Sequence, residues 1–401
     1  MIIPVSVKNQ SIDSSGITSD YKAAISEYIW NGFEANAKKV SIEYTLNEAF
    51  GVKELIIKDN GDGINYDELG ETFGAFLASK KNLLSLQIKS KANKGKGRFS
   101  FIAFSSNAEW HTVYKDNNVY KEYDINMSSD KKEVIDCSEP QLSDRQETGT
   151  EVKFTNINTL TAENMGFEII EPALLKDFAW FLYLYKNKNV EIVVNDEKID
   201  YEKYINTELS EKSMVTIEGY RFEINLVVWQ ESISEKFCCY YFDDKNVLKG
   251  NRTTTFNRNT VNFNHSVFVK SEFFDDKENV IGDHNDTQIN MFEYPDEKKI
   301  LKKLHKEIQM LISNMKKGEN LTKSNVISAC LGIHIPFRVS NHMLSLADLT
   351  LNMTSKGQVG DDNETYDMLL HLKWTTDYDD IYEELKVQSK DHLIHQPPVK
   401  K

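Results

Sequence analysis

The segment LIIKDNGDGI, residues 55–64, places two acids, an amide and two glycines directly after an apolar run. The run predicts a buried strand over residues 54–59, and the glycines predict a turn where that strand ends. Backbone can approach a flat ligand closely at Gly61 and Gly63, and Asp59 can accept hydrogen bonds from an amine there. The alternative is an ordinary Asn-Gly or Asp-Gly turn.

The preceding segment predicts a helix over residues 19–38, because apolar residues recur there on one helical face. Glu27, Asn31 and Glu34 share a stripe that points away from that face. A carboxylate can polarise a water, and an amide oxygen can ligate Mg²⁺, so Glu27 and Asn31 are compatible with a base beside a metal ligand. The alternative is a solvated polar face.

A glycine- and lysine-rich segment follows in SKANKGKGRFS, residues 90–100. Gly95 and Gly97 flank Lys96, and Arg98 begins an apolar, helix-like segment. Glycine-rich backbone before a helix N-terminus is typical of phosphate binding. The chain contains no GxxxxGK[ST] motif, so this is not a P-loop. A solvated lysine-rich loop is the alternative.

The segment ETGTEVKF supplies a fourth motif, in which Thr148, Gly149 and Thr150 open a predicted strand over residues 149–157. A hydroxyl at this point can support a carboxylate that recognises a base. By itself the motif is equally compatible with an ordinary turn.

The order of these four segments resembles the GHKL ATPase superfamily, which includes gyrase B, the heat-shock-protein-ninety chaperones, histidine kinases, MutL and the microrchidia ATPases. EYIWNGFEANAKKVSI resembles the N-box, with Glu34-Ala35 where the family usually has Asp-Ala. DNGDGI matches the second box, KGKGRFSF resembles the third with shortened glycine spacing, and TGT matches the fourth. The resemblance covers roughly residues 15–160.

The resemblance implies that the chain binds ATP and Mg²⁺. Glu27 would be the general base that activates water, and Asn31 would ligate Mg²⁺. Asp59 would bind the adenine amine, with Thr150 assisting through a water. The other residues implied at the nucleotide, including the lid over the phosphates, are Gly61, Gly63, Ile64, Ser79, Lys80, Gly95, Lys96, Gly97, Arg98 and Phe99.

The remaining chain resembles the branches that carry a transducer domain, and the MutL and microrchidia branches most. A histidine kinase is not indicated, because no His precedes His111. The predicted class is α+β: a two-layer GHKL sandwich at residues 1–160, then an α/β transducer-like domain at 161–318. Residues 319–401 are predicted to be an extension that is partly helical or mobile.

In such transducers one lysine reaches the γ-phosphate. The candidates are Lys249 and Lys270, with Arg258 as an alternative, and each is also compatible with a surface cation. The pattern predicts helices over residues 171–187 and 297–317. Strands are predicted over residues 190–199, 214–229, 236–243 and 265–274.

Composition limits the functions available. A net charge of −14 does not support nucleic-acid binding, and four cysteines without a CxxC pair indicate a reduced protein without a cysteine zinc site. The start lacks a signal-peptide core, and no run reaches the roughly 18 apolar residues of a membrane helix. We therefore expect a cytoplasmic protein that does not enter membranes.

Two functions remain compatible with the sequence. The favoured one is a slow, Mg²⁺-dependent ATPase in which ATP joins two protomers and hydrolysis releases them. Its N-terminal arm, residues 1–13, would cross between protomers. Its output would be an unknown client protein or DNA, as in microrchidia-like or prokaryotic defence proteins. The alternative is a nucleotide-binding scaffold without hydrolysis, and the presence of Glu27 favours the enzyme.

Overall fold

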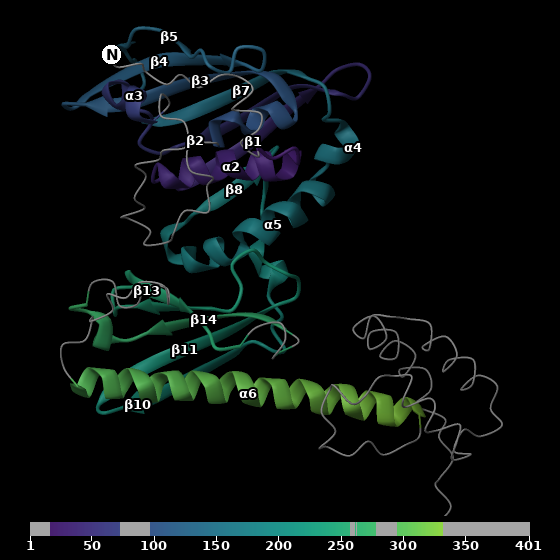
Figure 1. Cartoon of the computed structure of the whole chain (residues 1–401), viewed down its shortest axis with the longest axis vertical. Coiled ribbons are helices and arrows are strands. Elements are labelled where there is room, and N and C mark those ends of the chain that lie inside the picture. Colours follow the sequence, from purple (N-terminus) through teal and green to yellow (C-terminus); the bar gives the residue numbers. More distant parts are fainter. Residues whose placement is uncertain (1–16, 73–96, 257–260, 262, 278–294, 332–401) are drawn as a thin grey trace, which may run out of the picture. The chain divides into compact units, whose positions relative to one another are not determined.

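The computed structural model of the chain is shown in Figure 1. It describes residues 17–72, 97–256, 261, 263–277 and 295–331. These belong to two compact units that meet in sequence at Ile300 and Leu301, and each unit is described by itself. Several predicted features lie outside the described residues: the arm 1–13, Ser79, Lys80, Gly95, Lys96, Arg258 and most of 319–401.

The first sheet has nine strands in the order β5-β4-β3-β7-β2-β1-β8-β9, with β6 paired to β4. It is mixed, because β8 runs parallel to β1 whereas β2 runs antiparallel to both β1 and β7. The strands are β1 (Lys39–Leu46), β2 (Val52–Asp59), β3 (Ser105–Asp116), β4 (Val119–Ser128), β5 (Asp136–Cys137), β6 (Gln141–Leu142), β7 (Gly149–Ile157), β8 (Glu191–Val194) and β9 (Glu197–Lys198).

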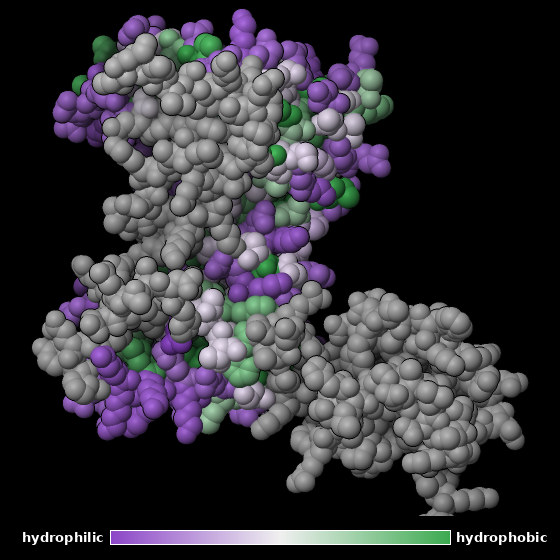
Figure 2. Space-filling model, viewed as in Figure 1, coloured by the Kyte–Doolittle hydropathy of each residue, from purple (hydrophilic) through white to green (hydrophobic). Residues whose placement is uncertain are grey.

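One face of this sheet carries the core and the other is polar. Residues alternate along β7, where Thr150, Val152 and Phe154 are buried and their neighbours are partly exposed. On the polar face, Lys153 pairs with Glu54 at 2.9 Å. Figure 2 shows mainly hydrophilic residues on the described surface over β4 and β5. This alternation is the usual pattern of a sheet covered on one side only.

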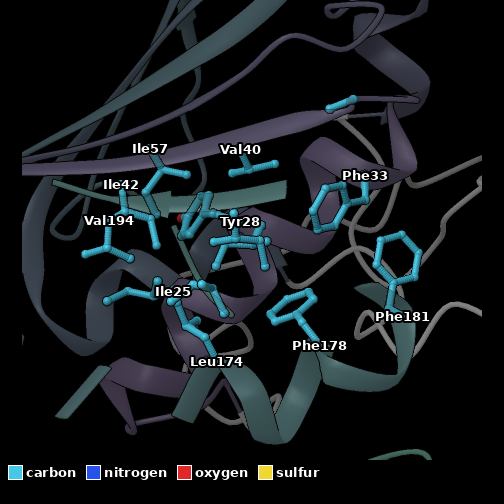
Figure 3. Packing of buried hydrophobic residues seen from close by; sticks show 14 of the residues in the cluster. Ile25, Tyr28, Phe33, Val40, Ile42, Ile57, Leu174, Phe178, Phe181 and Val194 are labelled. Carbon is cyan, nitrogen blue, oxygen red and sulfur yellow. The ribbon is translucent and has the colours of Figure 1, made fainter. Parts of the chain in front are cut away.

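Helix α2 (Tyr21–Glu34) lies between the core face of the sheet and helix α5 (Phe167–Leu184), as Figure 3 shows. Asp20 caps the start of α2 by accepting a hydrogen bond from the Lys22 amide. The Ser26 hydroxyl donates to Asp177 on α5 at 2.8 Å. Because α2 is buried on two sides, its position against the sheet is fixed.

The second sheet has five strands in the order β10-β11-β14-β12-β13, with β12 parallel to β14. They are β10 (Glu211–Ile217), β11 (Tyr220–Trp229), β12 (Cys238–Phe242), β13 (Leu248–Thr253) and β14 (Asn264–Lys270). The turn between β10 and β11 contains Glu218 and Gly219, which both have positive φ. The sequence did not predict β13.

The same helix α5 contacts both sheets. Trp180 stacks on Tyr240 of β12 with ring centroids 6.1 Å apart, and Tyr183 contacts Phe268 of β14 at 4.5 Å. One hydrophobic cluster therefore includes residues of both sheets. The first sheet also includes β8 and β9, which lie beyond residue 160. The α+β class is confirmed, whereas the division into domains at residue 160 stays a prediction.

The remaining elements are short, apart from one helix. They are η1 (Tyr66–Glu68), α3 (Leu69–Thr72), η2 (Gly97–Ala103), α4 (Ala162–Met165), η3 (Lys186–Lys188), η4 (Tyr201–Tyr204), η5 (Glu272–Phe274) and α6 (Pro295–Leu331). Asn65 caps η1 by accepting a hydrogen bond from the Asp67 amide. No helix among the described residues is both long and apolar enough to cross a bilayer.

Candidate functional site

The candidate site lies where apolar rows of the first sheet give way to a polar row. Residues directly opposite one another on β2, β7 and β3 form these rows on the core face. The two apolar rows are Leu55, Phe154 and Ala108, then Ile57, Val152 and Trp110. The next row is Asp59, Thr150 and Thr112, so three polar side chains from distant segments become neighbours.

Hydrogen bonds connect this polar row to the DNGDGI segment. The hydroxyls of Thr112 and Thr150 lie 3.1 Å apart, and the Ile64 amide donates to Thr112 Oγ1 at 2.9 Å. Thr112 is fully buried. The sequence indicated Asp59, Thr150 and Ile64 but missed Thr112. Its only signal is a polar residue at an inward position of the strand EWHTVY.

The other polar residues of DNGDG hold the loop in place. Asn60 Oδ1 accepts hydrogen bonds from the amides of Lys38 and Lys39, at 2.9 and 2.8 Å. The Asp62 amide donates to the Ala35 carbonyl at 2.7 Å, and the Asp62 carboxylate accepts from Asn36 Nδ2 at 2.5 Å. The loop is thereby attached to the connection between α2 and β1.

The two glycines of the loop are required by the chain itself. A β-carbon at Gly61 would collide with the Ala35 carbonyl oxygen, and one at Gly63 with the Val113 carbonyl oxygen. Gly63 also has φ +74°, which side chains rarely adopt. The Gly61 amide donates to Asp59 Oδ1 at 2.8 Å. The glycines thus bring the loop close enough to orient the Asp59 carboxylate.

Glu27 and Asn31 converge on the start of η2. A β-carbon at Gly97 would lie 3.0 Å from Glu27 Oε2 and 3.6 Å from Asn31 Nδ2. A β-carbon at Gly32, one residue further along α2, would lie 2.9 Å from Cβ of Asp59. Helix α2 therefore runs from the carboxylate–amide pair towards the polar row, and it joins the two parts of the site.

Tyr28 fixes the beginning of η2 against α2. Its buried hydroxyl donates to the Arg98 carbonyl at 3.0 Å and accepts from the Phe101 amide at 3.2 Å. The Arg98 guanidinium lies 4.7 Å from the centroid of the Phe99 ring. Burial lowers the pKa of Arg98 to about 10, so this side chain still carries a positive charge at neutral pH.

A cavity of about 490 Å³ opens at the polar row. Asp59 and Thr150 line it, together with Val113 and the connecting residues 145–148. This volume is within the range of small-molecule sites. The lining is mostly polar and also includes Lys58, Asn60, Gly149 and Glu151. The cavity is large enough for a purine ring.

Mg²⁺ requires oxygen ligands. The described part of the chain holds no cluster of three or more His, Cys, Asp or Glu. Mg²⁺ commonly takes one or two protein oxygens and completes its shell with phosphates and water. Asn31 Oδ1, beside the Glu27 carboxylate at Gly97, fits that requirement.

The candidate transducer lysines have partners on the second sheet. Lys249 Nζ lies 3.3 Å from the buried Asp243 carboxylate and donates to the Asp275 carbonyl at 3.1 Å. Lys270 Nζ lies 3.8 Å from Asp244. A phosphate role for either lysine stays a prediction, and for Lys249 it would require breaking a mostly buried ion pair.

Part of this chain is similar to known proteins. Residues 18–159 match a family model described as "Histidine kinase-, DNA gyrase B-, and HSP90-like ATPase". No curated protein matches the chain. The ATPase region of Saccharomyces cerevisiae topoisomerase II overlaps 62% of this chain and 72% of its own, with 14% identity and a TM-score of 0.36. That overlap is too weak to support a conclusion about function.

Proposed function

We propose that this chain, whose residues 18–159 belong to the histidine kinase-, DNA gyrase B- and HSP90-like ATPase family, is a slow Mg²⁺-dependent ATPase that works as a conformational switch. The family match confirms the predicted GHKL resemblance and supports ATP binding. The nearest branch, dimerisation, the client and a cytoplasmic location stay predictions.

The polar row supplies the base-binding end. The Asp59 carboxylate, oriented by the Gly61 amide at 2.8 Å, can accept a hydrogen bond from the adenine amine. Thr150 lies opposite Asp59 and lines the same cavity. A charge-assisted hydrogen bond in a partly enclosed site is stronger than one between neutral groups, so Asp59 would contribute most to base recognition.

The α2–η2 contact supplies the phosphate end. Glu27 would accept a proton from the attacking water, and Asn31 Oδ1 would hold Mg²⁺. Bound Mg²⁺ would neutralise charge on the phosphates and orient them. Because Gly97 has no β-carbon, the backbone of η2 can lie close to both side chains. The charged Arg98 follows directly in η2.

The attachment of η2 to α2 supports a switch. The Tyr28 hydroxyl of α2 makes two hydrogen bonds to the backbone of η2. A shift of η2 caused by the phosphates would therefore also displace α2. Helix α2 packs on α5, and α5 contacts the second sheet. A contiguous chain of contacts therefore leads from the phosphate end to the region predicted to be a transducer.

The main support for this proposal is that Glu27 and Asn31 both lie beside Gly97, while Gly32 of the same helix lies beside Asp59 of the polar row. Its test is Mg²⁺-dependent phosphate release by wild type and by Glu27→Gln, with ATP affinity measured calorimetrically on both. We expect turnover to fall by at least 100-fold while affinity changes less than about threefold. Glu43→Gln, an exposed acid on β1, is the matched control and should behave as wild type.

Two other outcomes are informative. If wild type binds ATP without turning it over, the alternative of a nucleotide-binding scaffold replaces the ATPase. If wild type does not bind ATP, both functions are wrong.

A further inference from the structure

We propose that Tyr28 is a positioning residue for turnover, whose hydroxyl holds the start of η2 so that Gly97 stays beside the Glu27 carboxylate. The inference rests on the proposed function. Tyr28 has none of the roles in base, metal or phosphate binding that the sequence predicted. The inference follows from the two hydrogen bonds of one buried hydroxyl.

The first step concerns the direction of these two hydrogen bonds. A carbonyl can only accept and an amide can only donate, so the Tyr28 hydroxyl must donate to Arg98 and accept from Phe101. Burial raises the pKa of Tyr28 well above its usual value of 10, and the charge of neighbouring Glu27 raises it as well. The hydroxyl therefore keeps its hydrogen at neutral pH and can make both bonds at once.

The second step concerns where these bonds lie in η2. Arg98 and Phe101 are three residues apart, which is the spacing at which a 3₁₀ turn pairs its own carbonyl and amide. Here the carbonyl and the amide of one such turn both bond to a side chain from α2. The position of this turn thus depends on Tyr28 as well as on η2 itself.

The third step concerns how firmly the hydroxyl is held. The Tyr28 ring packs edge-on against Phe154 with centroids 4.8 Å apart, and it lies 6.4 Å from the ring of Trp110. Both partners belong to the apolar rows of the first sheet. Figure 3 shows Tyr28 within the hydrophobic cluster. Because the ring is buried against the sheet, the hydroxyl is a fixed point that locates η2.

The fourth step connects this point to the phosphate end of the site. Glu27 directly precedes Tyr28 on α2, just as Gly97 directly precedes Arg98 on η2. A β-carbon at Gly97 would lie 3.0 Å from Glu27 Oε2, so the backbone of η2 borders the carboxylate. A displacement of the start of η2 would change what lies beside Glu27, whereas the polar row belongs to the sheet. Loss of the hydroxyl should therefore affect the reaction more than base binding.

The experiment compares kcat and calorimetric ATP affinity of full-length wild type, Tyr28→Phe and Tyr21→Phe in the presence of Mg²⁺. Phenylalanine keeps the ring and removes only the hydroxyl. Tyr21 is the matched control, because it lies on the same helix and its hydroxyl donates to the Asn164 carbonyl of α4 at 2.9 Å. For Tyr28→Phe we expect kcat per ATP-binding site to fall at least about tenfold, with ATP affinity within about threefold. Tyr21→Phe should keep both within about twofold of wild type.

The Glu27→Gln background separates positioning from general damage. If Tyr28 acts by keeping η2 beside Glu27, adding Tyr28→Phe to Glu27→Gln should leave the residual turnover within about twofold. A further loss of about tenfold in this background would overturn the inference, as would equal losses of kcat in Tyr28→Phe and Tyr21→Phe. A kcat of Tyr28→Phe within about twofold of wild type would also overturn it.

If Tyr28→Phe does not fold, hydrogen exchange of the Phe101 amide in wild type decides. A lasting bond to Tyr28 should make this exchange at least about 100-fold slower than in an unstructured peptide, and exchange at the unstructured rate would overturn the inference. A wild type that binds ATP without turning it over would overturn the proposed ATPase and this inference with it. A contrary result in the Tyr28 variants alone overturns only the inference and leaves the ATPase standing.

Discussion

Each sheet buries a group of polar side chains, and the two groups differ in what surrounds them. In the first sheet, Asp59, Thr150 and Thr112 form one row that ends at a cavity. In the second sheet, the indole of Trp229 donates to Ser266 at 3.0 Å, and His265 Nε2 lies 3.1 Å from the Thr254 hydroxyl.

The second group is closed off. The rings of Phe237 and Phe263 lie 5.2 and 5.5 Å from the His265 ring, and both His265 and Ser266 are fully buried. The polar row of the first sheet instead borders a cavity, so the two groups differ in their access to a ligand.

The largest effect should follow from closing that space in the first sheet. Gly61→Ala places a β-carbon against the Ala35 carbonyl, so we expect a loss of about 3 kcal/mol in the free energy of unfolding and of detectable ATP binding. Urea denaturation and ATP titration measure both. Gly70→Ala, where nothing lies within 4 Å of the new carbon, is the control and should stay within about 0.5 kcal/mol.

The second sheet should respond to acid. Burial lowers the pKa of His265 from 6.5 to about 4, so between these pH values the unfolded chain binds a proton that the folded chain does not. Stability from this group is therefore complete above about pH 6.5 and is lost as the pH falls towards 4, by about 2 kcal/mol at pH 5. The free energy of unfolding of His265→Gln, measured by denaturation, should lack this part of the pH dependence. The same loss of stability between pH 6.5 and 4 in His265→Gln as in wild type would contradict the prediction.

The smallest expected effect on stability is that of removing one buried hydroxyl, and it distinguishes the polar group of the second sheet from that of the first. Ser266→Ala removes the acceptor of the Trp229 indole, and we expect a loss of about 1 kcal/mol in stability with ATP affinity unchanged. Thr112→Val removes a hydroxyl of similar burial from the first sheet but should alter ATP affinity as well. Calorimetric titration of both variants with ATP tests this difference. A lower ATP affinity of Ser266→Ala would contradict it.

Much of the first sheet could be predicted because its signals are local. The strand predicted over residues 149–157 has the bounds that the structure has, Gly149–Ile157. Asp59 and Thr150 were recognised from glycine-containing motifs beside them. Thr112 could not be, because its importance comes from strand register with Thr150, a partner 38 residues away.

The DNGDG segment shows a second limit of sequence reasoning. Its glycines were predicted to let a ligand approach the backbone. In the structure they are already required by the fold, because a β-carbon at Gly61 or Gly63 would collide with the carbonyl oxygen of Ala35 or Val113. Asn60 and Asp62 are held by backbone and side-chain partners from the α2–β1 connection. Those contacts depend on how α2 meets the sheet, which no local pattern encodes.

The most direct test of the polar row is a calorimetric titration of wild type and Asp59→Asn with ATP and with GTP in the presence of Mg²⁺. We expect wild type to prefer ATP strongly and Asp59→Asn to lose at least tenfold in ATP affinity, because a charge-assisted acceptor is removed. The preference over GTP should shrink as well, since an amide can donate to the guanine oxygen. Equal ATP affinity in the two proteins would contradict base recognition by this row.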